Sequence, residues 1–250
     1  METQSGILES EEKYVQENSL DCKLFIHSDA EQSKIAIIDA QNKIRLIQEK
    51  ATEDFFKGKA GILNLRFSKT YLICMPENLS LIPLDLYEED PESSVETSNL
   101  IAADSYTSVI DKQGCMASFL PHEDQKFWLS ILQDAELIPS SKIMINYLTD
   151  LKVKYKTILG LNFYADSFEV VYLEQSLLQF YSQLPASTPD EFNFFLLTLF
   201  EKLTINPALV QFYLWGNISE SDKNFERLTK YSKNITFASS NFLMGAIECV

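Results

Sequence analysis

Glycine is scarce in this chain. Only 7 of the 250 residues are glycine, whereas globular proteins average about 7%. Gly58 and Gly61 are the only two that lie close together, so the sequence contains neither a P-loop nor a G-x-G-x-x-G fingerprint. Loops that surround a phosphate with peptide N–H groups depend on glycine for close approach. The sequence therefore excludes the usual phosphate-binding loops.

Closely spaced metal ligands and the common nucleophile motif are also missing. The cysteines and histidines are Cys22, Cys74, Cys115, Cys249, His27 and His122. They form no C-x-x-C pair, and structural zinc sites usually contain such close pairs. No G-x-S-x-G elbow is present. Four free thiols suit a reducing compartment, so we expect a cytoplasmic protein with no bound metal.

Positive charge is the third deficit. The chain has 21 Lys and Arg against 36 Asp and Glu, a net charge of −15, and no two basic residues are adjacent. Nucleic-acid binding and attraction to anionic lipid both depend on clustered Lys and Arg. The longest strongly apolar stretch, 194–200, is too short to span a bilayer, and the polar start (1–13) is not expected to be a signal peptide. We expect no nucleic-acid partner and no membrane insertion.

The first half of the chain contains short apolar segments that alternate with turns. Three strands with short connections, 22–27, 34–39 and 43–48, predict an antiparallel meander. The remaining predicted elements of this half are a helix at 52–57, strands at 62–67, 71–75 and 116–120, a helix at 123–134 and a helix that begins at Ser140 or Ser141. Residues 1–20 and the acidic stretch 86–98 are predicted to be mobile.

The second half repeats this order more clearly. Predicted strands at 158–163, 168–173 and 177–183 precede a helix with a T-x-x-E capping box at Thr188 and Glu191. That helix is apolar nearly all round, which predicts that it is buried. A strand at 210–215, a helix capped by Ser219 and a strand at 235–238 follow. We infer an internal duplication with a flexible acidic tail (1–20), an N-terminal lobe (21–152) and a C-terminal lobe (153–250).

The two predicted first hairpins read FIHSDAEQSKIAIID and GLNFYADSFEVVYL. With this order of elements, the chain resembles the actin-like ATPase superfamily, and most of all its pilus-assembly and cell-division members. It is also similar to a group of uncharacterised bacterial proteins with a degenerate actin-like fold. The resemblance implies an α/β fold of two duplicated ribonuclease-H-like lobes, each a mixed sheet flanked by helices.

The phosphate-binding motifs of that superfamily are altered here. Its hairpins carry D-x-G, in several branches followed by a Lys. In this chain, His27 stands at the Asp position, Asp29 at the Gly position and Lys34 at the Lys position. In the second hairpin, Asn162 and Tyr164 replace the Asp and the Gly. Of the usual glycine pair near the nucleoside, only Gly216 remains. A shift of two residues would instead place Asp29 at the acidic position.

These replacements lead to three hypotheses on function. The first is a non-catalytic actin-like scaffold or protein-interaction module, a pseudoenzyme with no catalytic residue, cofactor or metal ligand. It implies an unidentified protein partner, and a homodimer stays open. The alternative is a divergent Mg-ATP-binding ATPase or sugar-kinase-like phosphotransferase that uses Asp29, Lys34 and Asp166. A ribonuclease-H-type nuclease is the third, and the acidity of the chain disfavours it.

Overall fold

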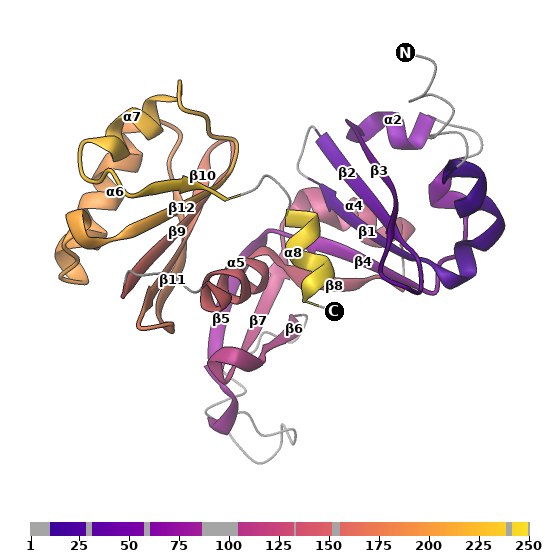
Figure 1. Cartoon of the computed structure of the whole chain (residues 1–250), viewed down its shortest axis with the longest axis horizontal. Helices are drawn as coiled ribbons and strands as arrows, with labels where there is room; N and C mark the ends of the chain where they lie inside the picture. The colour runs from indigo at the N-terminus through magenta and orange to yellow at the C-terminus, as the bar shows by residue number, and fades with distance from the viewer. Residues whose placement is uncertain are drawn as a thin grey trace. The chain divides into compact units, whose positions relative to one another are not determined.

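The computed structural model describes residues 11–28, 32–57, 61–86, 105–132, 134–151, 156–238 and 242–249. The chain divides into two compact units. Unit 1 contains Met1–Val109, Met116–Ser140 and Phe242–Val250, and unit 2 contains Ile110–Cys115 and Ser141–Asn241. Each unit has a five-stranded mixed sheet (Figure 1). The observed units are therefore interleaved in sequence, whereas the predicted lobes were two continuous segments.

The sheet of unit 1 has the strand order β3-β2-β1-β4-β8. Its strands are β1 (Lys23–Ser28), β2 (Gln32–Ile38), β3 (Ile44–Ala51), β4 (Lys69–Cys74) and β8 (Glu136–Pro139), and its helices include α2 (Thr52–Lys57) and α4 (Glu123–Ile131). Strands β1, β2 and β3 form the predicted antiparallel meander, and β4 and β8 run parallel to β1 and β4 respectively. A buried cluster that includes Leu24, Ile35, Leu72 and Trp128 forms its core.

One predicted strand of unit 1 is wrong, and three of its strands, among them β8, were not predicted. Residues 62–67 contain the 3₁₀ helix Ile62–Asn64, and their apolar side chains pack against the core without joining the sheet. A separate three-stranded sheet has the order β5 (Pro76–Pro83), β7 (Cys115–Pro121) and β6 (Tyr106–Ile110). Only β7 was predicted. Strand β5 begins and ends with proline, which is tolerated because it lies at an edge of the sheet.

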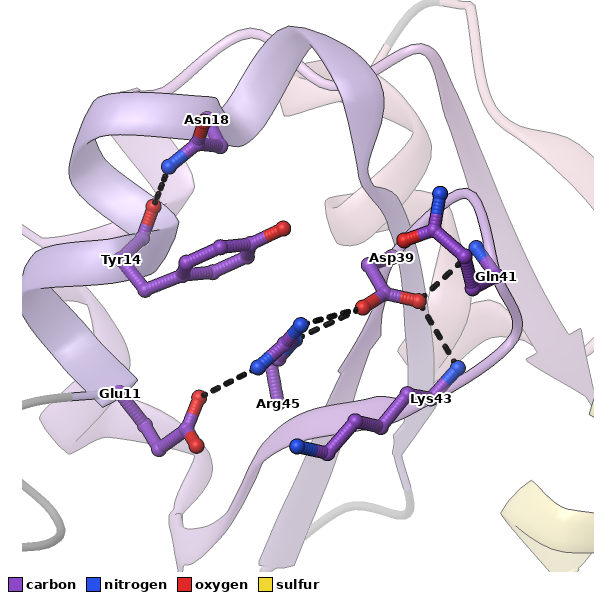
Figure 2. A network of polar contacts seen from close by, with 7 residues as sticks. All are labelled: Glu11, Tyr14, Asn18, Asp39, Gln41, Lys43 and Arg45. Atoms are coloured by element: carbon purple, nitrogen blue, oxygen red, sulfur yellow. Dashed lines mark hydrogen bonds and ion pairs between the residues drawn. The ribbon is translucent and has the colours of Figure 1, made fainter.

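The described part of the predicted tail is structured. Residues 11–18 form a helix, and Val15 is completely buried in the core of unit 1. Figure 2 shows how this helix is joined to the β2–β3 turn. The Arg45 guanidinium donates to Asp39, lies 3.7 Å from a Glu11 carboxylate oxygen and covers the ring of Tyr14. This cluster and the contact of Val15 explain why the segment docks despite its polar composition.

The sheet of unit 2 repeats the topology of unit 1. Its order is β11-β10-β9-β12-β13, with β9 (Thr157–Phe163), β10 (Ser167–Glu174), β11 (Leu177–Pro185), β12 (Gln211–Gly216) and β13 (Ile235–Phe237). Strands β9, β10 and β11 are antiparallel, and β12 and β13 follow in parallel. The same order and strand directions in both sheets confirm the predicted duplication.

Two helices of unit 2 lie on one face of its sheet. Helix α6 (Pro189–Lys202) begins at the predicted capping box, but it is not buried all round because only one of its faces packs on the strands. Helix α7 (Lys223–Thr229) is capped by Asp222, not by Ser219 as predicted. The Asp222 carboxylate accepts the N–H of Asn224 at 2.7 Å, whereas the Ser219 hydroxyl contacts Ser221.

The two units exchange helices. Helix α5 (Ser140–Asp150) follows the sheet of unit 1 in sequence, yet it packs in unit 2, where its Leu148 contacts Gly160 of β9. A Cβ at Gly160 would lie 2.6 Å from a terminal methyl of Leu148, so a larger residue there would require the Leu148 side chain to move. Helix α8 (Phe242–Glu248), which was not predicted, follows the sheet of unit 2 and packs in unit 1 against β1.

Short 3₁₀ helices complete the described chain: η1 (Ser19–Asp21), η2 (Ile62–Asn64), η3 (Leu84–Leu86), η4 (Asp111–Gln113) and η5 (Pro207–Leu209). The stretch 87–98, most of the acidic segment predicted to be mobile, lies outside the described residues, as do residues 1–10 of the predicted tail.

Candidate functional site

The first hairpin places His27 and Lys34 opposite each other on β1 and β2. The His27 ring stacks on Phe242 of α8, with the ring centroids 5.5 Å apart. The Lys34 ammonium lies 3.2 Å from a carboxylate oxygen of Glu49 on β3. Asp29, the residue on which both alignments of this hairpin depend, lies outside the described residues. His27 therefore packs against helix α8, and Lys34 forms an ion pair with a residue of strand β3.

Neutral polar groups surround the last residue pair of this hairpin. Ser28 and Ser33 face each other with their hydroxyl oxygens 2.6 Å apart, and Ser33 also contacts the hydroxyl of Thr52 at 2.9 Å. The buried Gln125 amide donates to the Ser28 carbonyl at 3.4 Å. Hydroxyls and amides are poorer ligands for Mg²⁺ than carboxylates. No group of three or more His, Cys, Asp or Glu side chains in the described ranges could hold a metal ion.

The second hairpin contains a buried carboxylate that sequence analysis did not identify. Glu169 of β10 is completely buried and lies opposite Asn162 of β9. Its carboxylate accepts hydrogen bonds from Asn162 Nδ2 at 2.9 Å, from the Tyr164 hydroxyl at 2.6 Å and from the Tyr181 hydroxyl at 2.7 Å. We call these four residues the Glu169 network. Three donors around one carboxylate compensate part of the cost of burying it.

The Glu169 network uses the whole side chain of Asn162. Besides its bond to Glu169, Asn162 Nδ2 donates to the Tyr164 hydroxyl oxygen at 2.6 Å, so both amide hydrogens are engaged. Asn162 is only 2% exposed. The side chain of Asn162, which stands at the predicted acidic position of the second hairpin, therefore lies inside unit 2 as part of the network.

Gly216 ends β12 next to this network. Its φ is +79°, and a Cβ there would lie 2.0 Å from the Phe163 carbonyl oxygen and 2.8 Å from Asn162 Oδ1. The following N–H, of Asn217, donates to the same Phe163 carbonyl at 2.9 Å. The close approach of two backbone segments within unit 2 is therefore sufficient to explain this glycine.

A cavity of about 320 Å³ lies at the carboxyl ends of β9 and β12, where ligands of α/β sheets commonly bind. Its lining includes Tyr164, Ser187, Thr188, Asn217, Asp222, Lys223 and Asn224. Carboxylates of this chain accept some of the backbone N–H groups at the two helix starts beside it. Glu191 accepts the N–H groups of Ser187 and Thr188 at 2.9 and 3.0 Å. These acids occupy some of the backbone donors that a phosphate would need, and Lys223 is the one cation among the described residues that line the cavity.

The buried cysteines are poor candidates for a nucleophile. Cys22, Cys74 and Cys115 are buried. Burial raises the pKa of the Cys115 thiol, and burial followed by the nearby carboxylate of Asp39 raises the pKa of Cys22. A thiol with a raised pKa is a weak nucleophile at neutral pH.

One sequence signal could have revealed the Glu169 network. Glu169 is the only charged residue between Phe168 and Leu173, in the segment FEVVYL. A central strand that is buried on both faces tolerates an acid only when partners neutralise or hydrogen-bond it. The partners themselves come from β9, β11 and the hairpin turn, and their convergence depends on the register of the strands.

Comparison with known proteins places the chain in a family. The family model described as "Protein of unknown function (DUF3822)" matches residues 11–235. No curated protein matches the sequence. Within the described residues, no helix combines the length and the apolar character needed to cross a membrane.

A crystal structure from Bacteroides thetaiotaomicron VPI-5482, a protein with an actin-like ATPase fold and unknown function, matches with a TM-score of 0.77. It is 14% identical, and the match covers 94% of this chain and 98% of that one. This match confirms the predicted fold class and the resemblance to actin-like proteins.

Two further structures match with lower scores. A PilM–PilN type IV pilus biogenesis complex matches with 12% identity, a TM-score of 0.48 and 89% coverage of both chains. The ethanolamine utilization protein EutJ from Carboxydothermus hydrogenoformans matches with 9% identity, a TM-score of 0.47 and 96% coverage of both chains.

Proposed function

This chain belongs to the DUF3822 family, and we propose that it is a non-catalytic protein-interaction module built on an actin-like fold. The Glu169 network carries this proposal. At the position where the resemblance implies a carboxylate that acts near a metal ion, Asn162 is buried and uses both amide hydrogens inside unit 2. We also propose that the protein acts in the cytoplasm, because its four free cysteines suit a reducing compartment.

Two further observations support a site that does not hold nucleotide. Beside the cavity of unit 2, Glu191 accepts the N–H groups of Ser187 and Thr188 and Asp222 accepts that of Asn224, so a phosphate would meet negative charge there. Lys34, at the one phosphate-motif position of the first hairpin that matches the resemblance, pairs with Glu49. In this chain, its own side chains occupy the groups that would bind nucleotide in an actin-like protein. We therefore propose that the fold is kept for binding another protein through its surface.

The test is whether Mg-ATP binds or turns over. A ligand that binds only the native state raises the melting temperature, by an amount that grows with its concentration relative to Kd. We expect no rise in Tm at millimolar Mg-ATP or Mg-ADP and no phosphate release above that of heat-treated protein. An actin-like ATPase assayed in parallel provides the positive control.

The opposite result would support the divergent ATPase. Turnover that is lost in both Asp29→Ala and Lys34→Ala would mean that the shifted alignment of the first hairpin is correct. In that case the pseudoenzyme proposal is wrong, whatever the role of the second hairpin.

A further inference from the structure

The outer face of helix α6 exposes two large apolar side chains. Phe194 is 63% exposed and Leu197 is 43% exposed. They are three residues apart and therefore lie next to each other on the helix surface. The opposite face of α6, which includes Phe192, Leu196 and Leu199, is buried in the core of unit 2. Within unit 2, the Phe194 ring meets the edge of the Phe195 ring, with the centroids 5.4 Å apart, but most of the Phe194 side chain stays exposed.

Helix α7 supplies positive charge beside this apolar pair. Residues 223–233 contain the basic residues Lys223, Arg227, Lys230 and Lys233 against one acid, Glu226, in a chain whose net charge is −15. Three of these cations, Lys223, Arg227 and Lys230, line a groove of about 290 Å³ together with Glu226 and with Pro189 and Asp190 of α6, so that its charged lining is three cations and two acids. The groove joins the basic face of α7 to the start of α6.

Direct contacts hold the two helices together. Asp190 of α6 accepts from Arg227 at 2.6 Å, and Asn193 of α6 accepts from the Tyr231 hydroxyl at 2.6 Å. Asp190 lies one helical turn before Phe194, and Asn193 lies one turn before Leu197. The apolar pair and the basic residues therefore form one continuous surface, which we call the α6–α7 surface.

We propose that the α6–α7 surface binds an acidic amphipathic helix of a partner protein. Its large apolar side chains would cover Phe194 and Leu197, and its carboxylates would lie against Lys223, Arg227 and Lys230. The existing ion pairs Asp190–Arg227 and Glu226–Lys230 are solvent-exposed. Exposed pairs contribute little to stability, so a partner's carboxylates can join or replace them at low cost. This proposal specifies the partner chemistry of the interaction module proposed above.

The experiment uses fluorescein-labelled amphipathic peptides of about 18 residues, or five helical turns. One has Leu on one face and Glu on the other, and its control has the same composition in scrambled order. An acidic peptide is repelled by the protein as a whole, so its binding requires a locally basic surface. We expect a Kd of about 10–100 μM by fluorescence anisotropy for the amphipathic peptide and no binding of the scrambled one.

Variants locate the binding surface. Phe194→Ser and Lys230→Glu should each weaken binding at least about tenfold, with Tm within a degree or two of wild type because both residues are exposed. Leu177→Ser, at a residue that is 61% exposed elsewhere in unit 2, should leave Kd unchanged. Amide exchange should slow in 190–202 and 223–233 on binding.

Three results would overturn the proposal: no binding at about 1 mM peptide, equal binding of the scrambled peptide, or binding that neither variant weakens. A dimer of this chain that Phe194→Ser converts to monomer would also overturn it, since the occupant would then be a second copy. None of these outcomes bears on whether the protein is non-catalytic, because the Mg-ATP experiment tests that proposal separately.

Discussion

At the scale of single residues, the contacts of Asn162 support a structural role for this residue. Its amide donates to the buried Glu169 carboxylate and to Tyr164, and its oxygen faces the backbone at Gly216. A carboxylate at this position could serve a metal, but it could not donate to Glu169. The network requires a hydrogen-bond donor at this position, whereas a magnesium site requires an anionic oxygen ligand.

The variant Asn162→Asp tests this distinction. The new carboxylate would lie within hydrogen-bond distance of Glu169 in a buried site, so repulsion and the lost donor should reduce stability by about 2–4 kcal/mol. The loss should be greatest at neutral pH and smaller in acid, where one of the two acids becomes protonated. Denaturant unfolding at several pH values measures it.

The control is Asn217→Asp, which adds the same charge at an exposed residue next to Gly216 and replaces none of the donors of the network. If Asn162→Asp leaves the stability unchanged and the Tm of this variant rises when Mg-ATP is added, the position faces a ligand site and the structural role is wrong.

At the scale of elements, the helix at 11–18 shows how a polar segment becomes ordered. The backbone N–H of Lys43 donates to the Asp39 carboxylate and holds its pKa below the usual value, against the opposing effect of burial. Hydrogen bonds from Arg45 and from the N–H of Gln41 act in the same direction as Lys43. Since Arg45 also lies against Glu11 and Tyr14, the charge of Asp39 supports the docking of the helix (Figure 2).

The lowered pKa makes docking of this helix dependent on pH. A carboxyl whose folded pKa is depressed contributes stability above its unfolded pKa, about 3.9, and loses that contribution as pH falls through the folded value. We therefore expect Asp39→Asn to have a lower Tm than wild type at pH 7, with the difference shrinking below about pH 4. In wild type, the protection factors of the amides in 11–18, that is, the exchange rates of an unfolded chain at the same pH divided by the observed rates, should fall over the same acidic range.

A control variant at an exposed acid of the same helix, Glu17→Gln, should not reproduce the effect, because the ion pair of Glu17 within the described residues is a long surface pair with Lys13. A constant Tm difference between Asp39→Asn and wild type from pH 7 to pH 2.5 would contradict the assignment.

At the scale of the whole molecule, the exchange of helices makes unit 1 depend on the end of the chain. Phe242, Leu243 and Ala246 of α8 are buried, and α8 packs against β1. We expect Leu243→Ala to destabilise unit 1 by about 2–4 kcal/mol, with faster amide exchange in β1 and β4. Glu248→Ala, on the exposed side of α8, should have little effect. Faster exchange confined to β9 and β12 would mean that α8 belongs to unit 2.

Much of the fold was determined by the sequence alone. Alternating apolar residues with short turns are sufficient to produce both meanders, and the Thr188–Glu191 capping box marks the start of α6, because these signals arise between residues that are near in sequence. The scarcity of glycine predicts, in the same local way, that the usual phosphate-binding loops are absent. These are the features that single-sequence reasoning can reach.

The tertiary structure decided what depends on residues far apart in the chain. Docking of 11–18, the edge strand β5 with its terminal prolines, the packing of α8 on β1 and the single buried face of α6 each follow from which surfaces meet. The Glu169 network is the clearest case. Its donors come from β9, from the hairpin turn and from β11, and only the strand register brings them to one carboxylate. A buried charge is stable only where several donors converge, and convergence is a property of the folded chain.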